Sequence, residues 1–155
     1  MAVTRAEIEA ALKVWGTNLV SISKAFHSGA DHKKLAAELI KNTYNYGNGQ
    51  VLFKPTLASQ NTFRTTFEGA LSYFVGGDSR FEEDRGFALN PWESVDFEIA
   101  GVILGKTHAI VMGNKHLKDT SGKLILANFT MGFVRDPSGG LKINLHHSSL
   151  PYISN

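Results

Sequence analysis

The sequence predicts a single α+β domain, residues 1–155, in which three N-terminal helices pack on one face of a mostly antiparallel sheet. Three observations lead to this class. A stripe of apolar residues at spacings of three and four runs through the first 26 residues, as in an amphipathic helix. Four alternating segments separated by short turns fill the last third, as in a meander of strands. A length of 155 residues fits one domain with an ordinary core.

The first two helices have clear start signals. Thr4 followed by Glu7 is the pattern of a capping box, and Gly29 ends the helix that follows it. Asp31 can cap a second, shorter helix. The apolar stripe of the first helix consists of Ile8, Leu12, Trp15, Leu19, Ile22 and Phe26.

A turn, a short strand and a third helix follow. Residues 44–49 are rich in Asn and Gly, which is typical of a turn, and residues 51–53 form a short strand that Pro55 stops. We expect a third helix to begin at Asn61 or Thr62 and to end at Gly76. Its apolar positions are Phe63, Phe67, Leu71 and Phe74.

The remaining chain predicts a meander with compact hairpin turns. Its strands are expected at Ser94–Leu104, His108–Lys118, Lys123–Arg135 and Leu141–Ser149. The second of these strands is apolar on both faces, since Ile110 lies on one side and Val111 on the other. Helices can cover only one face, so we expect a homodimer through the outer sheet face, to which Val111 is assigned.

Composition argues against several classes of function. The net charge of +2 is dispersed and no basic patch appears, which argues against a nucleic-acid binder. The absence of cysteine excludes thiolate catalysis and cysteine-ligated zinc, and His108 and His116 are too far apart on one strand to share an ion. We therefore expect no metal and no cofactor.

No apolar stretch approaches the roughly 20 residues that cross a bilayer, so no membrane segment is expected. The first residues lead into a helix and contain no signal-peptide core. The compartment stays unknown; the cytoplasm is favoured, and the periplasm remains open if a leader was removed.

Two adjacent histidines near the end of the last strand are the best chemical clue. Strand alternation places His147 on the apolar face with Ile143 and Leu145, and His146 on the opposite face. His147 is therefore the candidate general acid or base, because an imidazole titrates near neutral pH. The alternative is a buried histidine hydrogen-bonded to a backbone carbonyl or a tyrosine hydroxyl.

A ligand pocket is predicted beside His147. Amphipathic aromatic residues next to loops suit a pocket mouth, and an apolar row on the third meander strand suits its wall. The predicted pocket residues are Tyr44, Tyr46, Trp92, Phe129, Met131 and Phe133. Asp96 and Glu98 share one strand face; they pair with the histidine if that face looks inward, and lie outside if Phe97 does.

Three patches carry a family resemblance: the turn at residues 52–57, the aromatic helix at residues 67–74, and the terminal strand at residues 144–151. They resemble the nuclear transport factor 2-like superfamily, also called cystatin-like or SnoaL-like. Within it, they are most similar to bacterial relatives of the association domain of calcium/calmodulin-dependent protein kinase II. The resemblance implies a curved sheet that forms a cone with the helices and encloses a pocket.

Two functions follow from these expectations. The first is binding of a small organic ligand in a mostly apolar pocket, in which a cofactor-independent SnoaL-like cyclisation, isomerisation or dehydration would use His147. Whether the protein is an enzyme stays open. The alternative is a non-catalytic, homo-oligomeric association module that resembles the kinase domain.

Overall fold

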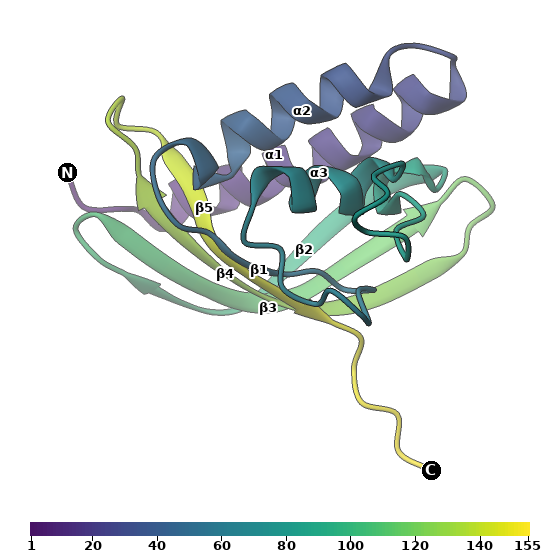
Figure 1. The fold of residues 1–155 in the computed structure, drawn as a ribbon. Coiled ribbons are helices and arrows are strands. Elements are labelled where there is room, and N and C mark those ends of the chain that lie inside the picture. The colour runs from purple at the N-terminus through teal and green to yellow at the C-terminus, as the bar shows by residue number, and fades with distance from the viewer.

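In the computed structural model, which describes all 155 residues, the helices lie on one face of a curved five-stranded sheet (Figure 1). The α+β prediction is confirmed. The helices are α1 (Arg5–His27), α2 (His32–Thr43) and α3 (Phe67–Val75), with short 3-10 turns η1 (Asn45–Gly47) and η2 (Phe87–Leu89). The strands are β1 (Leu52–Lys54), β2 (Trp92–Leu104), β3 (His108–Asp119), β4 (Leu124–Arg135) and β5 (Leu141–Ser149).

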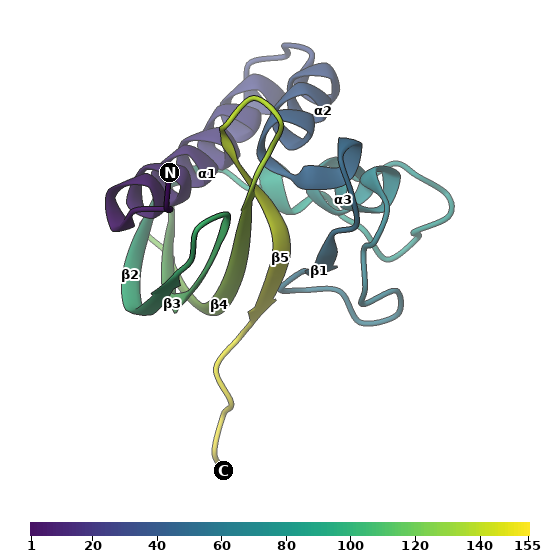
Figure 2. The same cartoon turned by 90° about the vertical axis from the view of Figure 1, so that its left-hand side faces the viewer.

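The sheet order is β1-β5-β4-β3-β2, which Figure 2 shows along the curve of the sheet. Strands β2 to β5 form the predicted antiparallel meander, whereas β1 pairs with β5 in parallel. Their register places Phe53 beside His146 and Lys54 beside His147. This parallel pair brings the turn after β1 next to the end of β5.

The predicted starts of the first two helices are confirmed. The Thr4 hydroxyl accepts a hydrogen bond from the Glu7 amide at 3.2 Å, and the Glu7 carboxylate accepts one from the Thr4 amide at 2.8 Å. Asp31 accepts a hydrogen bond from the amide of Lys34 at 3.1 Å and caps α2. None of the three helices has the length and hydrophobicity that a membrane-spanning helix requires.

The third helix begins later than predicted, at Phe67, where Thr66 caps it. The expected start at Asn61 or Thr62 is wrong, and Phe63 is largely exposed. The reason is Arg64, whose amide donates a hydrogen bond to the carbonyl of Phe53 at 2.6 Å. This bond ties the segment before α3 to β1 and keeps it out of the helix.

Arg64 also forms a buried ion pair with Asp84. Its guanidinium donates two hydrogen bonds of 2.7 Å to the carboxylate, and the exposed fractions of the two side chains are 0% and 2%. Further hydrogen bonds join Arg64 to the carbonyls of Asn61 and Gly69, and the Ser72 hydroxyl donates to Asp84. The pair therefore connects α3, at Gly69 and Ser72, to the loops around it.

A β-bulge in β5 reverses the expected face of the two histidines. Gly132 of β4 pairs with Leu145, but Phe133 pairs with Ile143, so Asn144 is an extra residue in β5. After the bulge, His146 faces the helices and is buried, whereas His147 is exposed on the outer face. The predicted inward orientation of His147 is therefore wrong.

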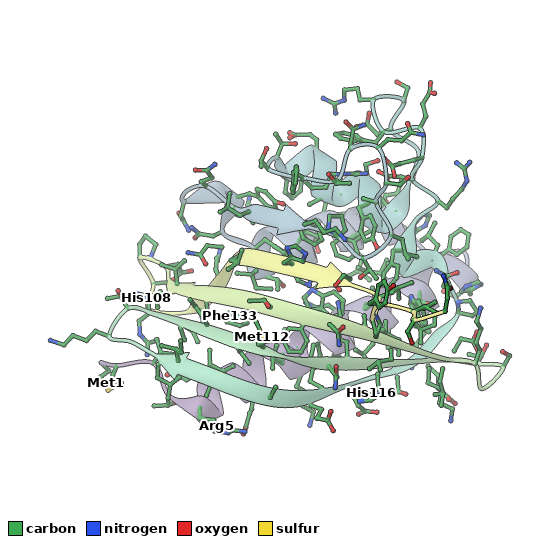
Figure 3. The ribbon with its side chains drawn as sticks, turned by 90° about the horizontal axis from the view of Figure 1, so that it is seen from below. Met1, Arg5, His108, Met112, His116 and Phe133 are labelled. Carbon is green, nitrogen blue, oxygen red and sulfur yellow. The ribbon has the colours of Figure 1, made fainter.

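The outer face of the sheet keeps several apolar side chains exposed. Ile110 and Met112 of β3 are 39% and 56% exposed, and Val111, which was assigned to this face, is instead fully buried beneath the helices. Asp96 and Glu98 of β2 also lie on the outer side, as the second alternative expected. Figure 3 looks onto this face, with Met112 and His116 labelled.

Because Arg64 and Asp84 satisfy each other inside the protein, removing one charge should leave the other buried and unpaired. We predict that Asp84→Asn lowers the free energy of unfolding by about 3–5 kcal/mol, measured by urea denaturation. The matched control is Glu9→Gln, which breaks the half-exposed pair with Arg5. This control should cost no more than about 0.5 kcal/mol, and equal losses in the two variants would contradict the prediction.

Candidate active site

A narrow cavity between the helices and the end of β5 combines hydrogen-bonding groups with aromatic rings. In this structure its side chains pack so closely that they leave no enclosed space as large as a water molecule. Its lining comes from α1, β1, α3, β3, β5 and the adjoining loops, and consists of Trp15, Phe53, Pro55, Thr56, Tyr73, Phe74, Phe87, Lys115, His146 and Ser148.

Two hydroxyl groups meet where β1 ends beside β5. Pro55 follows β1, and the next residue, Thr56, places its hydroxyl 2.7 Å from the hydroxyl of Ser148. The Lys54 ammonium donates a hydrogen bond of 2.9 Å to the Ser148 carbonyl, which holds this end of β5 against β1. Since a hydroxyl both donates and accepts, the pair can orient a water molecule or a ligand oxygen.

The protonation of His146 follows from its hydrogen-bond chain. The indole N–H of Trp15 donates to the Tyr44 hydroxyl oxygen at 3.0 Å, and this hydroxyl lies 2.8 Å from Nδ1 of His146. Because an indole nitrogen cannot accept a hydrogen bond, the buried Tyr44 hydroxyl can donate its own proton only to Nδ1. The neutral imidazole therefore carries its proton on Nε2.

The Nε2–H group of His146 is the part of this ring that can donate a hydrogen bond into the cavity. It is buried and has no hydrogen-bond partner within the protein. Burial lowers the pKa of His146 well below its usual value, and the nearby charges of Lys115 and His147 act in the same direction. The ring therefore stays neutral near pH 7 and presents an N–H donor that lacks an acceptor.

Tyr73 adds a second protonated donor from α3. Its hydroxyl oxygen accepts a hydrogen bond from the amide of Leu57 at 3.2 Å, which leaves its own proton available. Burial is the main cause that raises the pKa of Tyr73 above its usual value, so the hydroxyl stays protonated. Lys115 also lines the cavity, and its Nζ atom lies 4.4 Å from the centroid of the Trp15 ring.

None of the six predicted pocket residues lines this cavity. Tyr44 lies one hydrogen bond behind it, through His146. The Tyr46 hydroxyl donates to the Arg64 carbonyl at 2.7 Å, and the Trp92 indole donates to the Phe87 carbonyl at 2.8 Å. The predicted wall residues Phe129, Met131 and Phe133 belong to the hydrophobic core. Phe129 pairs with Ser148 and Met131 pairs with His146 across β4 and β5, so these two lie beside the cavity without lining it.

Four polar lining residues were not identified from the sequence: Thr56, Tyr73, Lys115 and Ser148. One of them, Lys115, could have been identified from the sequence pattern. Lys115 shares the inner face of β3 with Val111 and Leu117, and a lysine in an apolar row of a strand requires an explanation. No group of three or more His, Asp or Glu side chains is placed to hold a metal ion.

Comparison with known proteins gives close matches over nearly the whole chain. The family model described as metal-independent carbonic anhydrase matches residues 6–150. A metal-independent carbonic anhydrase from Nostoc sp. (strain PCC 7120) is 47% identical over 154 residues, which cover 97% of this chain and 75% of that protein. The crystal structure of an iota-carbonic anhydrase from a cyanobacterium, complexed with bicarbonate, is 45% identical with a TM-score of 0.96 and covers 99% of this chain and 95% of that one.

More distant structures share the fold. A putative calcium/calmodulin-dependent protein kinase II association domain from Xanthomonas campestris has a TM-score of 0.60 at 21% identity, and covers 98% of this chain and 91% of that one. A nuclear transport factor 2-like superfamily protein from Salmonella enterica has a TM-score of 0.55 at 14% identity, over 97% and 92% of the two chains. The predicted nuclear transport factor 2-like fold is confirmed.

The hydrogen-bond chain predicts a single tautomer for His146. We expect nitrogen-15 correlation spectra of the ring to show a protonated Nε2 and an unprotonated Nδ1 throughout the range from pH 6 to 8. In Tyr44→Phe, Nδ1 loses its donor and the Trp15 indole loses its acceptor, at a cost of about 1–3 kcal/mol for each buried group left unpaired. A wild-type ring that carries its proton on Nδ1, or that becomes charged in this range, would contradict the assignment.

Proposed function

Because the chain belongs to the family of metal-independent carbonic anhydrases, we propose that it interconverts carbon dioxide and bicarbonate in the cavity beside His146. The observation that carries the proposal is the convergence of a protonated imidazole N–H and three hydroxyl groups in a cavity lined by aromatic rings. The related cyanobacterial enzyme was crystallised in complex with bicarbonate.

Membership of this family overturns both functions expected from the sequence. The predicted cyclisation, isomerisation or dehydration of an apolar organic ligand is wrong, and so is the non-catalytic association module. The nuclear transport factor 2-like fold carries many unrelated activities, so a resemblance at the level of the fold pointed to the wrong chemistry. The large apolar pocket that the first function required is replaced by a small cavity with polar groups at one end.

The cavity provides different surroundings for the two forms of the substrate. Carbon dioxide has no charge and no hydrogen-bond donor, so the rings of Trp15, Phe53 and Phe74 are a suitable wall for it. When a water oxygen attacks the carbon, negative charge develops on the oxygen atoms of the former carbon dioxide. The N–H of His146 and the hydroxyl of Tyr73 are donors that can stabilise this charge.

The paired hydroxyls of Thr56 and Ser148 suit the attacking water. The two hydroxyl oxygens are 2.7 Å apart, so one hydroxyl donates a hydrogen bond to the other. The remaining proton and the free lone pairs can bind a third oxygen atom. A water held there would be oriented before it reacts, and orientation contributes to the rate in any bimolecular step. In the reverse direction, the same groups would hold the oxygen atoms of bicarbonate.

The neighbouring histidines provide a matched test of this site. We predict that His146→Phe lowers kcat/KM for carbon dioxide hydration about 100-fold, because it keeps a flat ring but removes a donor at the developing charge. His147→Phe, one residue away on the exposed face, should retain the wild-type rate. Stopped-flow hydration assays with a pH indicator measure both. Equal rates for the two variants would contradict the assignment to His146.

The family also leads to an expectation about metals. Protein dialysed against a strong chelator should hydrate carbon dioxide at the same rate as untreated protein, since the family is described as metal-independent. Metal analysis of the dialysed sample provides the control. A rate that falls with the metal content and returns on adding zinc would contradict the proposed function as a metal-independent enzyme.

We also propose that the outer sheet face pairs with a second copy of the chain. Besides Ile110 and Met112, Ile103 and Leu126 are exposed on this face, at 71% and 41%. An apolar area that the helices do not cover favours association. In a symmetric dimer, the same residues would meet around a two-fold axis.

A charge in the middle of this face should separate the subunits. We predict that Met112→Glu shifts the mass measured by light scattering from that of a dimer to that of a monomer. Val14→Glu is the matched control, because Val14 is 52% exposed on α1, away from the sheet face. A wild-type protein that is already monomeric would refute the interface.

A further inference from the structure

Lys115 is a buried cationic side chain with no counter-ion. It is only 1% exposed, it forms no ion pair or hydrogen bond, and no carboxylate lines the cavity that it shares with His146. Removing an ammonium group from water is costly unless an acid or several acceptors replace the water. The contact with the Trp15 ring compensates only part of this cost.

The position of Lys115 is rigid. It lies in the central part of β3, where its backbone pairs with Phe97 on β2 and with Ala127 on β4. Its side chain rises from the inner face of the sheet toward α1. Strand pairing on both sides fixes the backbone of Lys115, and α1 covers the inner sheet face above it, so the side chain is buried in the cavity.

Burial is the cause that lowers the pKa of Lys115 to about 7. The titratable groups on the elements around it are His146 on β5, Tyr44 at the end of α2 and Tyr73 on α3. All three are neutral near pH 7, and α1 contributes the uncharged ring of Trp15. Lys115 is thus the group in this cavity that changes charge near neutral pH.

Hydration of carbon dioxide requires a proton acceptor, and the other polar groups of the cavity are unsuitable. His146 has its Nδ1 occupied by Tyr44 and its proton on Nε2, so it can donate to the cavity but cannot accept there. Tyr73 is held in its protonated form. The hydroxyls of Thr56 and Ser148 are very weak bases. The neutral amine of Lys115 has a free lone pair.

We propose that Lys115 is the general base of the reaction, an inference that rests on the proposed carbon dioxide hydration. The water oxygen forms a bond to the carbon of carbon dioxide, and one C=O electron pair moves onto the oxygen that accepts from His146 Nε2–H. One O–H bond of the water breaks, and its proton goes to Nζ of Lys115. The products are bicarbonate and an ammonium group, which form an ion pair until bicarbonate leaves and the ammonium returns its proton to buffer.

Two substitutions at this position separate a base from a fixed charge. Lys115→Met removes both functions and keeps a side chain of similar length. Lys115→Arg retains a positive charge but cannot lose its proton in this pH range. We expect both variants to hydrate carbon dioxide at least about 100-fold more slowly than the wild type, as removal of a general base does. Recovery of most of the rate in Lys115→Arg would overturn the proposal and indicate a purely electrostatic role.

Lys118→Met is the matched control, since Lys118 lies on the same strand with its side chain on the outer surface, paired with Glu93. It should retain the wild-type rate. Circular dichroism of all three variants verifies that each is folded. A wild type without hydration activity would overturn the proposed function and this inference together. An active wild type with active Lys115 variants would overturn the role of Lys115 alone.

A direct titration tests the proposal without substitutions. In protein labelled with carbon-13 at the lysine Cε, one resonance should titrate with a midpoint of about 7, and it should be absent in Lys115→Met. The hydration rate should rise with pH through the same midpoint, because the neutral amine is the active form. A Lys115 resonance that titrates near the ordinary lysine value of about 10.4 would overturn the proposal.

Discussion

The buried ion pair between Arg64 and Asp84 is the constraint on which the position of the cavity depends. Both residues lie in irregular segments, which have no ladder of hydrogen bonds to hold them. The guanidinium binds the carboxylate in two places and also two backbone carbonyls, so both loops are attached to α3. Because Tyr73 belongs to α3 and Thr56 to the segment before it, this polar network supports two walls of the candidate site.

Most of the regular structure could be predicted because it follows from periodicity. The apolar stripe of α1 and the alternation of the meander strands are local patterns, and their bounds agree with the sequence within about two residues. The two wrong predictions, the start of α3 and the orientation of the histidines, have a common cause. Each depends on a contact between residues that are far apart in the sequence. Arg64 bonds to β1 and delays the start of α3, while the bulge at Asn144 depends on how β5 pairs with β4. One extra residue was enough to exchange the roles of His146 and His147.

The chemistry of the site depends on excluding water from two nitrogen bases. Burial keeps His146 neutral, and its hydrogen bond to Tyr44 turns it into a donor. Burial also moves the pKa of Lys115 to a value at which the side chain can exchange a proton near pH 7. In the sequence, Lys115 is one of several polar residues of β3, and nothing local shows that Trp15 covers it. The family likeness was needed to propose a substrate, because the fold alone permits many.

The parallel pairing of β1 with β5 has a consequence for the synthesis of the protein. The two hydroxyls that meet at this junction belong to residues 92 positions apart, and the other walls come from α1, α3 and β3. Contacts over such distances form late in folding, because the intervening chain must first be ordered. On the ribosome, the helices can pack against a growing sheet before β5 has emerged. The candidate site, however, forms only when β5 inserts between β4 and β1, so it is complete only after the other strands of this sheet have been made.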